Sequence, residues 1–170
     1  CTILITRANR DLVLEFTRQY ADDGWKVIAC CRNPDQADEL ASIAASNPEV
    51  VIEKLDVTDH AGIDALGKKY AGVPIDVLLN NAGIIGPIPI AENIERQSFG
   101  SMDYEVWADV LRTNTFAPLK MAEAFLENVA ASKQKKIVNI SSTVGSITEM
   151  TIPGVAYASS KSALNRAMTI

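Results

Sequence analysis

Apolar runs of strand length alternate with segments of helix length along this chain, and this alternation is what most constrains its fold. The strand-length runs are rich in β-branched residues and are expected at 2–6, 25–31, 50–56, 75–80 and 136–141. Strands that are apolar almost throughout are typical of a parallel sheet with helices on both faces. Because crossover connections are right-handed, the pattern predicts an α/β fold with a doubly wound parallel sheet.

This arrangement is a Rossmann-like three-layer α/β/α domain, and we expect it to occupy residues 1–170 as a single domain. Helices are expected at 12–23, 34–46, 59–71, from 101 to about 132 and from about 155 onward, with a long loop over 81–100. Ser101 is predicted to cap the longest helix, with Asp103 and Glu105 favourable near its positive end.

Small or polar residues stand where the predicted strands end. In doubly wound sheets, ligands bind beyond these carboxyl ends, at the switch in winding direction. The polar loops that follow any strand account for part of the pattern, but the sequence still predicts a ligand site there. The residues concerned are Thr6, Cys31, Asp56, Asn80 and Ser142.

Composition excludes several classes of function. A net charge of −5 without blocks of like charge argues against nucleic acid as a partner. No apolar run approaches the ~20 residues that cross a bilayer, so we expect no membrane span. Three cysteines, with Cys30 and Cys31 adjacent, favour a reduced, cytoplasmic setting. The lone His60 has no partner suited to a metal site.

Tyr157 and Lys161 lie four residues apart in the last predicted helix, which places them on one face. An ammonium group beside a phenol favours the phenolate, so such a pair can donate a proton near neutral pH. With Ser142 upstream, this Ser–loop–Tyr-x-x-x-Lys pattern resembles that of the short-chain dehydrogenases/reductases. Taken alone, the Tyr–Lys spacing also fits a half-buried aromatic residue and a solvated lysine.

The resemblance implies hydride transfer between a nicotinamide cofactor and a carbonyl or alcohol. It implies that Ser142 and Tyr157 bind the reacting oxygen, that Tyr157 gives the proton, and that Lys161 assists it while contacting the nicotinamide ribose. Asn114 is expected to hold a water in a proton relay, although an asparagine near Pro118 also fits a helix kink. Ser142 is preferred to Ser141, which is expected to face the sheet.

The most specific match is the stretch Asn80-Asn81-Ala82-Gly83, which has the family's N-N-A-G motif at the end of the fourth strand. The resemblance implies that Asn81, Ala82 and Gly83 steady the sheet and line the cofactor ribose. It also implies that Asp56 and Val57 hold the adenine ring. Arg10 and Arg32 stand where NADP-preferring relatives place basic residues, and both suit a 2′-phosphate; ordinary solvated arginines are the alternative.

The glycine-rich turn of the family is altered in this chain. Thr6 to Val13 reads TRANRDLV, with Arg7, Asp11 and Val13 in place of the three glycines of T-G-x-x-x-G-x-G. We expect Asp11 to place a carboxylate where a phosphate would meet the helix start, capping its amides itself, with Arg7 offsetting some of the charge. Val13 is expected to disturb the close packing of helix on strand.

The chain ends at Ile170, inside the last predicted helix, whereas the resemblance implies further strands and a substrate loop. We therefore expect a domain that is incomplete at its C-terminus, with the strand at 136–141 as an exposed edge. The resemblance also implies a homo-oligomer, either a dimer or a tetramer.

Two functions follow. The first is an NADP-dependent carbonyl reductase acting on a small-molecule carbonyl or alcohol. The second is a catalytically silent relative that keeps the fold for binding or assembly, which the altered turn favours.

Overall fold

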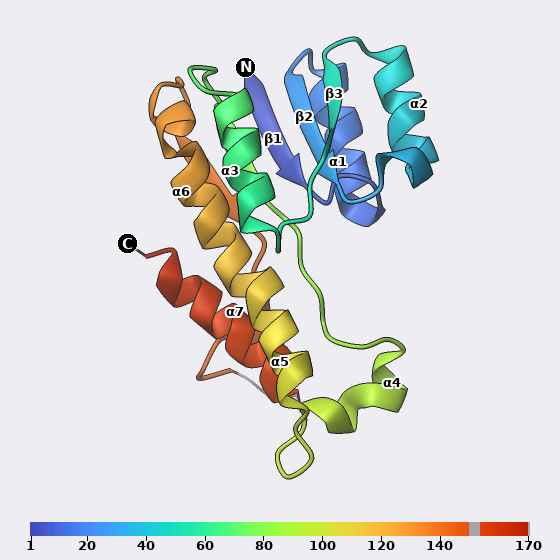
Figure 1. Cartoon of the computed structure of the whole chain (residues 1–170), viewed down its shortest axis with the longest axis vertical. Helices are drawn as coiled ribbons and strands as arrows, with labels where there is room; N and C mark the ends of the chain where they lie inside the picture. The colour runs from blue at the N-terminus through green and yellow to red at the C-terminus, as the bar shows by residue number, and fades with distance from the viewer. Residues whose placement is uncertain (150–153, 170) are drawn as a thin grey trace. The chain divides into compact units, whose positions relative to one another are not determined.

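The computed structural model describes residues 1–149 and 154–169, and the chain divides into two compact units (Figure 1). One unit, here called the sheet unit, comprises Cys1–Asn81 and Met121–Ile140. The other, here called the helical unit, comprises Ala82–Lys120 and Ser141–Ile170. No helix among the described residues has the length and apolar character that a bilayer crossing requires.

The sheet unit holds a five-stranded, all-parallel sheet in the order β3-β2-β1-β4-β5. This confirms the predicted fold class, and each predicted strand is present. Strand β5 is the last strand on its side and is partly exposed, as expected of an edge. The strands are β1 (Thr2–Thr6), β2 (Lys26–Cys31), β3 (Val50–Lys54), β4 (Val77–Asn80) and β5 (Lys136–Asn139).

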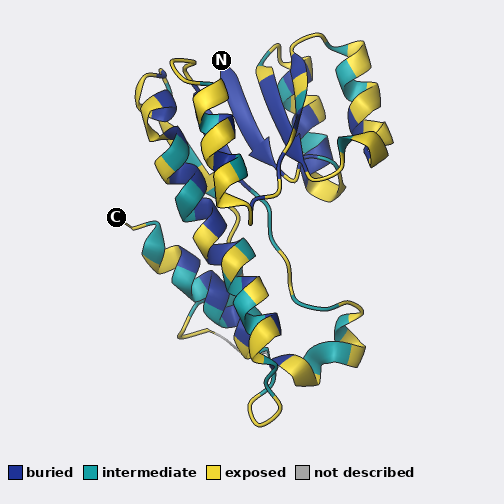
Figure 2. Cartoon of the chain, in the orientation of Figure 1, coloured by how far each residue is buried: buried dark blue, intermediate teal, exposed yellow. Residues whose placement is uncertain are grey.

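Helices cover this sheet because its central strands β1 and β2 are apolar on both faces, and Figure 2 shows in dark blue that these two strands are buried. Alternate residues of β1, Ile3 and Ile5, share a buried cluster with side chains of α1 (Asp11–Asp22) and α2 (Asp38–Ser46), which follows a short 3-10 turn, η1 (Pro34–Gln36). Helix α3 (His60–Lys69) approaches α6 (Ala117–Ala130) closely, since a Cβ on Gly67 would lie 3.0 Å from the Ala124 carbonyl oxygen.

The helical unit departs from the predicted helix boundaries in two places. The expected loop over 81–100 contains α4 (Ile90–Asn93) and a 3-10 turn, η2 (Ile94–Gln97). The expected single helix is α5 (Tyr104–Leu111), then a π-helical segment, η3 (Arg112–Phe116), then α6. Pro118 lacks an N–H and cannot complete the α-helical hydrogen bond to the Asn114 carbonyl, which favours widening here. Another 3-10 turn, η4 (Thr143–Gly145), and α7 (Val155–Ala167) complete the unit.

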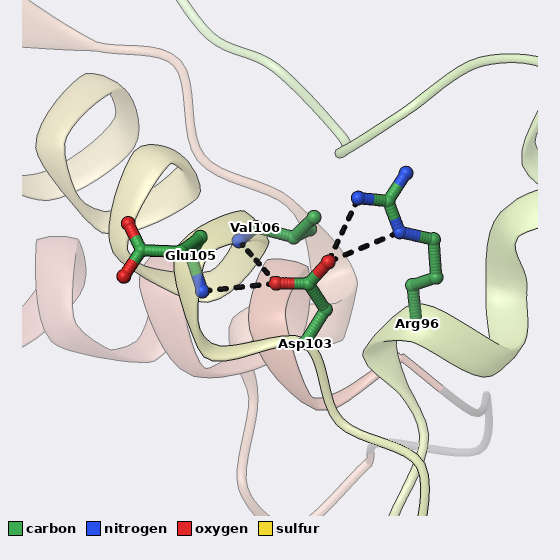
Figure 3. Close-up of polar contacts among 4 residues, drawn as sticks. All are labelled: Arg96, Asp103, Glu105 and Val106. Atoms are coloured by element: carbon green, nitrogen blue, oxygen red, sulfur yellow. Dashed lines mark hydrogen bonds and ion pairs between the residues drawn. The ribbon is translucent and has the colours of Figure 1, made fainter.

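Asp103, and not Ser101, caps α5 (Figure 3). Its Oδ1 accepts hydrogen bonds from the backbone N–H groups of Glu105 (3.0 Å) and Val106 (3.2 Å). Its Oδ2 accepts from Arg96 Nη2 at 2.7 Å, and this hydrogen bond is the main cause that holds the pKa of Asp103 below its ordinary value. The Ser101 hydroxyl instead donates to the Glu95 carbonyl at 2.7 Å.

Asp76 joins three segments of the sheet unit. This carboxylate is 6% exposed; Oδ2 accepts from the Thr2 backbone N–H at 2.8 Å. Its Oδ1 accepts from the backbone N–H groups of Lys133 (3.3 Å) and Gln134 (3.2 Å), just before β5. The hydrogen bond from Thr2 is the main cause that lowers the pKa of Asp76. The start of β1 and the turn before β5 thus depend on one ionised side chain.

We expect Asp76→Asn to lower the free energy of unfolding by about 2 kcal/mol near neutral pH, because it removes a charged acceptor. Since the folded pKa of Asp76 is lowered, its contribution is present above the unfolded value of about 3.9 and is lost as the pH falls further. Urea unfolding should therefore show wild type and Asp76→Asn converging in acid, whereas exposed Asp22→Asn should match wild type throughout. A gap that does not depend on pH would contradict this account.

Candidate active site

The four side chains predicted to carry catalysis all belong to the helical unit. Helix α7 holds Tyr157 half-buried and Lys161 only 5% exposed, with the Lys161 Nζ 5.8 Å from the centre of the Tyr157 ring. Burial lowers the pKa of the Lys161 ammonium. The predicted one-turn spacing therefore places an amine with weakened proton affinity beside a phenol.

Asn114 lies in the π-helical segment and is fully buried. Its Nδ2 donates to the Ile84 carbonyl (2.8 Å) and to Ser160 Oγ (3.0 Å), while its Oδ1 accepts from the Ile84 N–H (2.9 Å). Both N–H groups of the amide are therefore used to hold protein atoms. Asn114 ties the segment after the N-N-A-G motif to α7, and of its side chain only a lone pair on Oδ1 is left for a water.

Ser142 leads into the 3-10 turn η4, and its Oγ accepts from the Val144 N–H at 3.4 Å. That turn lies directly on α7, because Ser162 Oγ donates to the Gly145 carbonyl at 2.9 Å. A Cβ added to Gly145 would lie 3.0 Å from the carbonyl carbon of Lys161. The loop that carries Ser142 is thus fixed against the turn of α7 that carries Lys161.

The neighbouring serine does not behave as expected. Ser141 was predicted to face the sheet, but it is exposed and its hydroxyl donates to Asn165 Oδ1 of α7 at 2.6 Å. The chain has already left β5, which ends at Asn139, so strand alternation no longer sets the direction of this side chain.

Two of the predicted cofactor residues share a cavity in the sheet unit. It measures about 600 Å³ and is lined by Arg32, Lys54, Asp56 and Asp59, among others. Asp56 Oδ1 accepts from the N–H and hydroxyl of Thr58 (2.9 and 2.7 Å), and Asp59 caps α3. Both carboxylates therefore hold their own loops.

The two cations of this cavity, Arg32 and Lys54, have no side-chain hydrogen bond or ion pair among the described residues. Sequence analysis did not identify Lys54 as a cofactor residue. It ends β3 opposite Cys31, and its position beside Arg32 follows only from that strand register. Arg10 instead stands exposed at the start of α1, and Val57 is buried. Nowhere in the described ranges do three or more His, Cys, Asp or Glu side chains form a group that suits a metal ion.

The N-N-A-G motif steadies the sheet unit through its two asparagines. Asn81 donates from its backbone N–H to Thr6 Oγ1 (3.0 Å) and from Nδ2 to the Thr6 carbonyl (3.4 Å). Asn80 Nδ2 donates to Asn139 Oδ1 at 3.0 Å, which links the ends of β4 and β5. The half-buried Ala82 and Gly83 follow as the first residues of the helical unit.

The altered turn keeps the backbone shape that glycine usually provides. Arg7 and Asp11, at the first two glycine positions, have φ angles of 58° and 57°, in the left-handed region that costs a non-glycine residue about 1–2 kcal/mol. Arg7 Nη2 lies 3.6 Å from Asp11 Oδ2. Asp11 was expected to cap the amides of α1; its observed partner is Arg7, and the N-cap residue Arg10 makes no side-chain capping bond.

Val13, at the third glycine position, is 4% exposed and belongs to the same buried cluster as Ile3 and Ile5. Helix α1 therefore packs on the sheet with the valine inside the core, contrary to the expected disturbance. The side chains predicted to be catalytic fit a nicotinamide-dependent reaction, and the backbone shape of the turn fits a phosphate. The charge of the turn does not suit a phosphate, because Asp11 adds a carboxylate at the helix start.

Comparison with known proteins gives relatives along nearly the whole chain. Residues 1–169 match the short chain dehydrogenase family. The chain is 34% identical over 167 residues to galactitol 2-dehydrogenase of Agrobacterium fabrum, covering 95% of this chain and 59% of that protein. It is 30% identical over 160 residues to (+)-neomenthol dehydrogenase of Arabidopsis thaliana, covering 85% of this chain and 54% of the relative. The chain thus spans somewhat more than half the length of these relatives.

Solved structures agree with this assignment. An NADPH-bound carbonyl reductase from chicken fatty liver has a TM-score of 0.84 at 32% identity, covering 97% of this chain and 67% of that one. A short-chain dehydrogenase/reductase from Burkholderia multivorans with bound NADP has a TM-score of 0.84 at 29% identity, covering 98% and 70%. With the N-N-A-G clamp, the Tyr–Lys helix and these matches in agreement, this chain belongs to the short-chain dehydrogenase family.

Proposed function

We propose that this chain provides the catalytic residues of an NADP(H)-dependent oxidoreductase that interconverts a small-molecule carbonyl and its alcohol. The observation that carries the proposal is the fixed position of Tyr157 and Lys161 on α7. Asn114 holds this helix from one element, and the loop of Ser142 holds it from another. Such a rigid set of hydroxyl, phenol and amine suits proton transfer to a substrate oxygen.

In the proposed reaction, the hydroxyls of Ser142 and Tyr157 bind the carbonyl oxygen and stabilise its developing negative charge. Tyr157 donates the proton, and Lys161 favours its release by electrostatic attraction to the phenolate. The lowered pKa of Lys161 makes this amine a better partner for passing a proton on toward Asn114 and water. The hydride would come from NADPH when that cofactor is bound.

Cofactor contacts are proposed for each unit separately. We assign the 2′-phosphate to Arg32 with Lys54, the two cations of the sheet-unit cavity, whose side chains have no hydrogen bond or ion pair within 1–149 and 154–169. Asp56 and Val57 are assigned to the adenine side. The assignment of Asn81, Ala82 and Gly83 to the ribose rests on the family resemblance, as does that of Arg10 to the 2′-phosphate. Similar solved structures carry NADP or NADPH, which supports this choice of cofactor.

We further propose that the protein works in the cytoplasm as a homo-oligomer, without nucleic acid as a partner. The cysteines support a reducing compartment, because Cys1, Cys30 and Cys31 are all free thiols. Exposed apolar side chains support self-association: Phe116 is 50% exposed and Leu126 is 54% exposed. The net charge of −5 opposes binding to phosphate backbones.

Tyr157→Phe tests the reductase directly. It should lower kcat for reduction of small aldehydes and ketones by about 100-fold or more, because the proton donor is lost. The Kd for NADPH, measured by its fluorescence on mixing, should stay within about twofold, since the phenyl ring remains. Tyr104→Phe, an exposed tyrosine at the start of α5, serves as the control. Undiminished turnover in Tyr157→Phe would refute the assigned role.

Arg32→Gln and Lys54→Gln test the cofactor preference. Each should raise the Kd for NADPH by about tenfold, through loss of a charged phosphate contact, and leave the Kd for NADH unchanged. Lys26→Gln, an exposed lysine at the opposite end of β2, should affect neither cofactor. Equal losses for NADPH and NADH would mean that these cations do not recognise the 2′-phosphate.

Asp11→Asn tests the altered turn, since asparagine tolerates the left-handed backbone while removing the charge. The Kd for NADPH should fall by about tenfold in Asp11→Asn, because the carboxylate that repels phosphate is gone. Replacing Arg7 and Asp11 with glycine should also raise the free energy of unfolding by about 1–2 kcal/mol, because the entropy of glycine in the unfolded chain offsets part of the relief at two strained positions. Adding Val13→Gly should reverse that gain in stability, because it removes a buried side chain.

The same titrations decide between the enzyme and the silent relative, which the carboxylate at Asp11 favours. Binding that improves with Asp11→Asn supports an enzyme with a weakened phosphate turn. No binding by wild type or by any turn variant at millimolar NADPH supports the silent relative. Binding by wild type that stays flat across all turn variants contradicts our account of the turn.

A further inference from the structure

Ser160 lies between Tyr157 and Lys161 on α7, is fully buried, and is not among the predicted catalytic residues. Its hydroxyl donates to the Tyr157 carbonyl at 2.7 Å and accepts from Asn114 Nδ2 at 3.0 Å. Its own carbonyl accepts from the Thr115 hydroxyl at 2.9 Å. Two consecutive residues of the π-helical segment therefore bind α7 at this one serine.

Ser160 contacts the backbone carbonyl of Tyr157, which is also the acceptor for the backbone N–H of Lys161 in an α-helix. In a regular helix the N–H of residue 161 donates to the carbonyl of residue 157. A serine hydroxyl that donates to the same carbonyl shares that acceptor and bends the helix locally. The Ser160 hydroxyl therefore acts on the single helical turn that sets the spacing of the phenol and the amine.

The hydrogen bonds of this hydroxyl form a continuous chain: the Ile84 backbone, the Asn114 amide, the Ser160 hydroxyl and the Tyr157 carbonyl. Each link is buried or partly buried, so water competes for it poorly. We propose that Ser160 is a positioning residue, which fixes Tyr157 relative to Asn114 and Lys161 through this chain. The inference rests on the proposed oxidoreductase function and adds a residue to its site.

Ser159 offers a matched control one position away. It also accepts a hydrogen bond from a neighbouring element, Trp107 Nε1 of α5 at 2.9 Å, and also donates to a carbonyl three residues earlier, Ala156 at 3.2 Å. It does not contact Tyr157 or the π-helical segment in the described hydrogen bonds. Ser159→Ala and Ser160→Ala thus each remove one donated and one accepted hydrogen bond from α7. Only the hydrogen bonds lost in Ser160→Ala include one to Tyr157.

The experiment compares Ser160→Ala with Ser159→Ala in the full chain. Ser160→Ala should lower kcat by about 10- to 100-fold, as expected for a displaced catalytic group, with the KM for the carbonyl and the Kd for NADPH within about twofold. Ser159→Ala should keep kcat within about threefold of wild type. A Ser160→Ala variant that melts lower but turns over like wild type would overturn the proposal and leave Ser160 a structural residue.

A second measurement does not need turnover. In NMR spectra with labelled tyrosine rings, the Tyr157 signal, assigned by its loss in Tyr157→Phe, should move in Ser160→Ala and stay in place in Ser159→Ala. An unmoved signal in Ser160→Ala overturns the inference while the reductase proposal stands. A moved signal in a chain without turnover on any carbonyl supports the positioning role and refutes the reductase proposal.

Discussion

Buried hydrogen-bonding side chains that hold loop backbone are the constraint on which this structure depends. A buried amide or carboxylate without partners is costly, so each must lie where backbone groups need it. Asp76 gathers three such backbone N–H groups, and Asn128, 5% exposed, donates to the carbonyls of Tyr70 and Val73. Asn114 does the same for Ile84 in the helical unit. Parallel strands leave long connections, and these few polar residues fix them.

The strands and the longer helices could be predicted because their signal is periodic burial, which a linear sequence carries. Helix α7 starts at Val155 as expected, and all strands lie within their predicted ranges. Short helices such as α4 give too few turns for a period. The choice of Asp103 over Ser101 as N-cap depends on the partner Arg96 across a loop. Pro118 indicated an irregular helix near Asn114. The extent of the π-helical segment, however, depends on the hydrogen bonds that the Asn114 side chain makes to Ile84 and Ser160.

The residues of the candidate site that belong to short local motifs could be predicted from the sequence. Tyr157 with Lys161, and the run Asn80 to Gly83, carry their spacing in the sequence. Ser160 has no such signature, because one more serine in a helix is ordinary until Asn114 and Thr115 are seen to bind it. Lys54 required the register of β2 and β3. The wrong expectation for Ser141 came from predicting a strand as far as residue 141, whereas β5 ends at Asn139.

Gly145 fits against α7 with little room, since a Cβ there would also lie 3.0 Å from Asn165 Nδ2. This contact divides the loop after β5 into a part that cannot be redesigned and a part that can. Upstream, the contact between Gly145 and α7 leaves room only for a hydrogen atom, and this contact fixes the loop that carries Ser142. Downstream, Ile147 is 88% exposed, so its side chain can be exchanged without disturbing the contact that holds the loop of Ser142. Substitutions at Ile147 are therefore expected to be tolerated far better than substitutions at Gly145, two residues earlier.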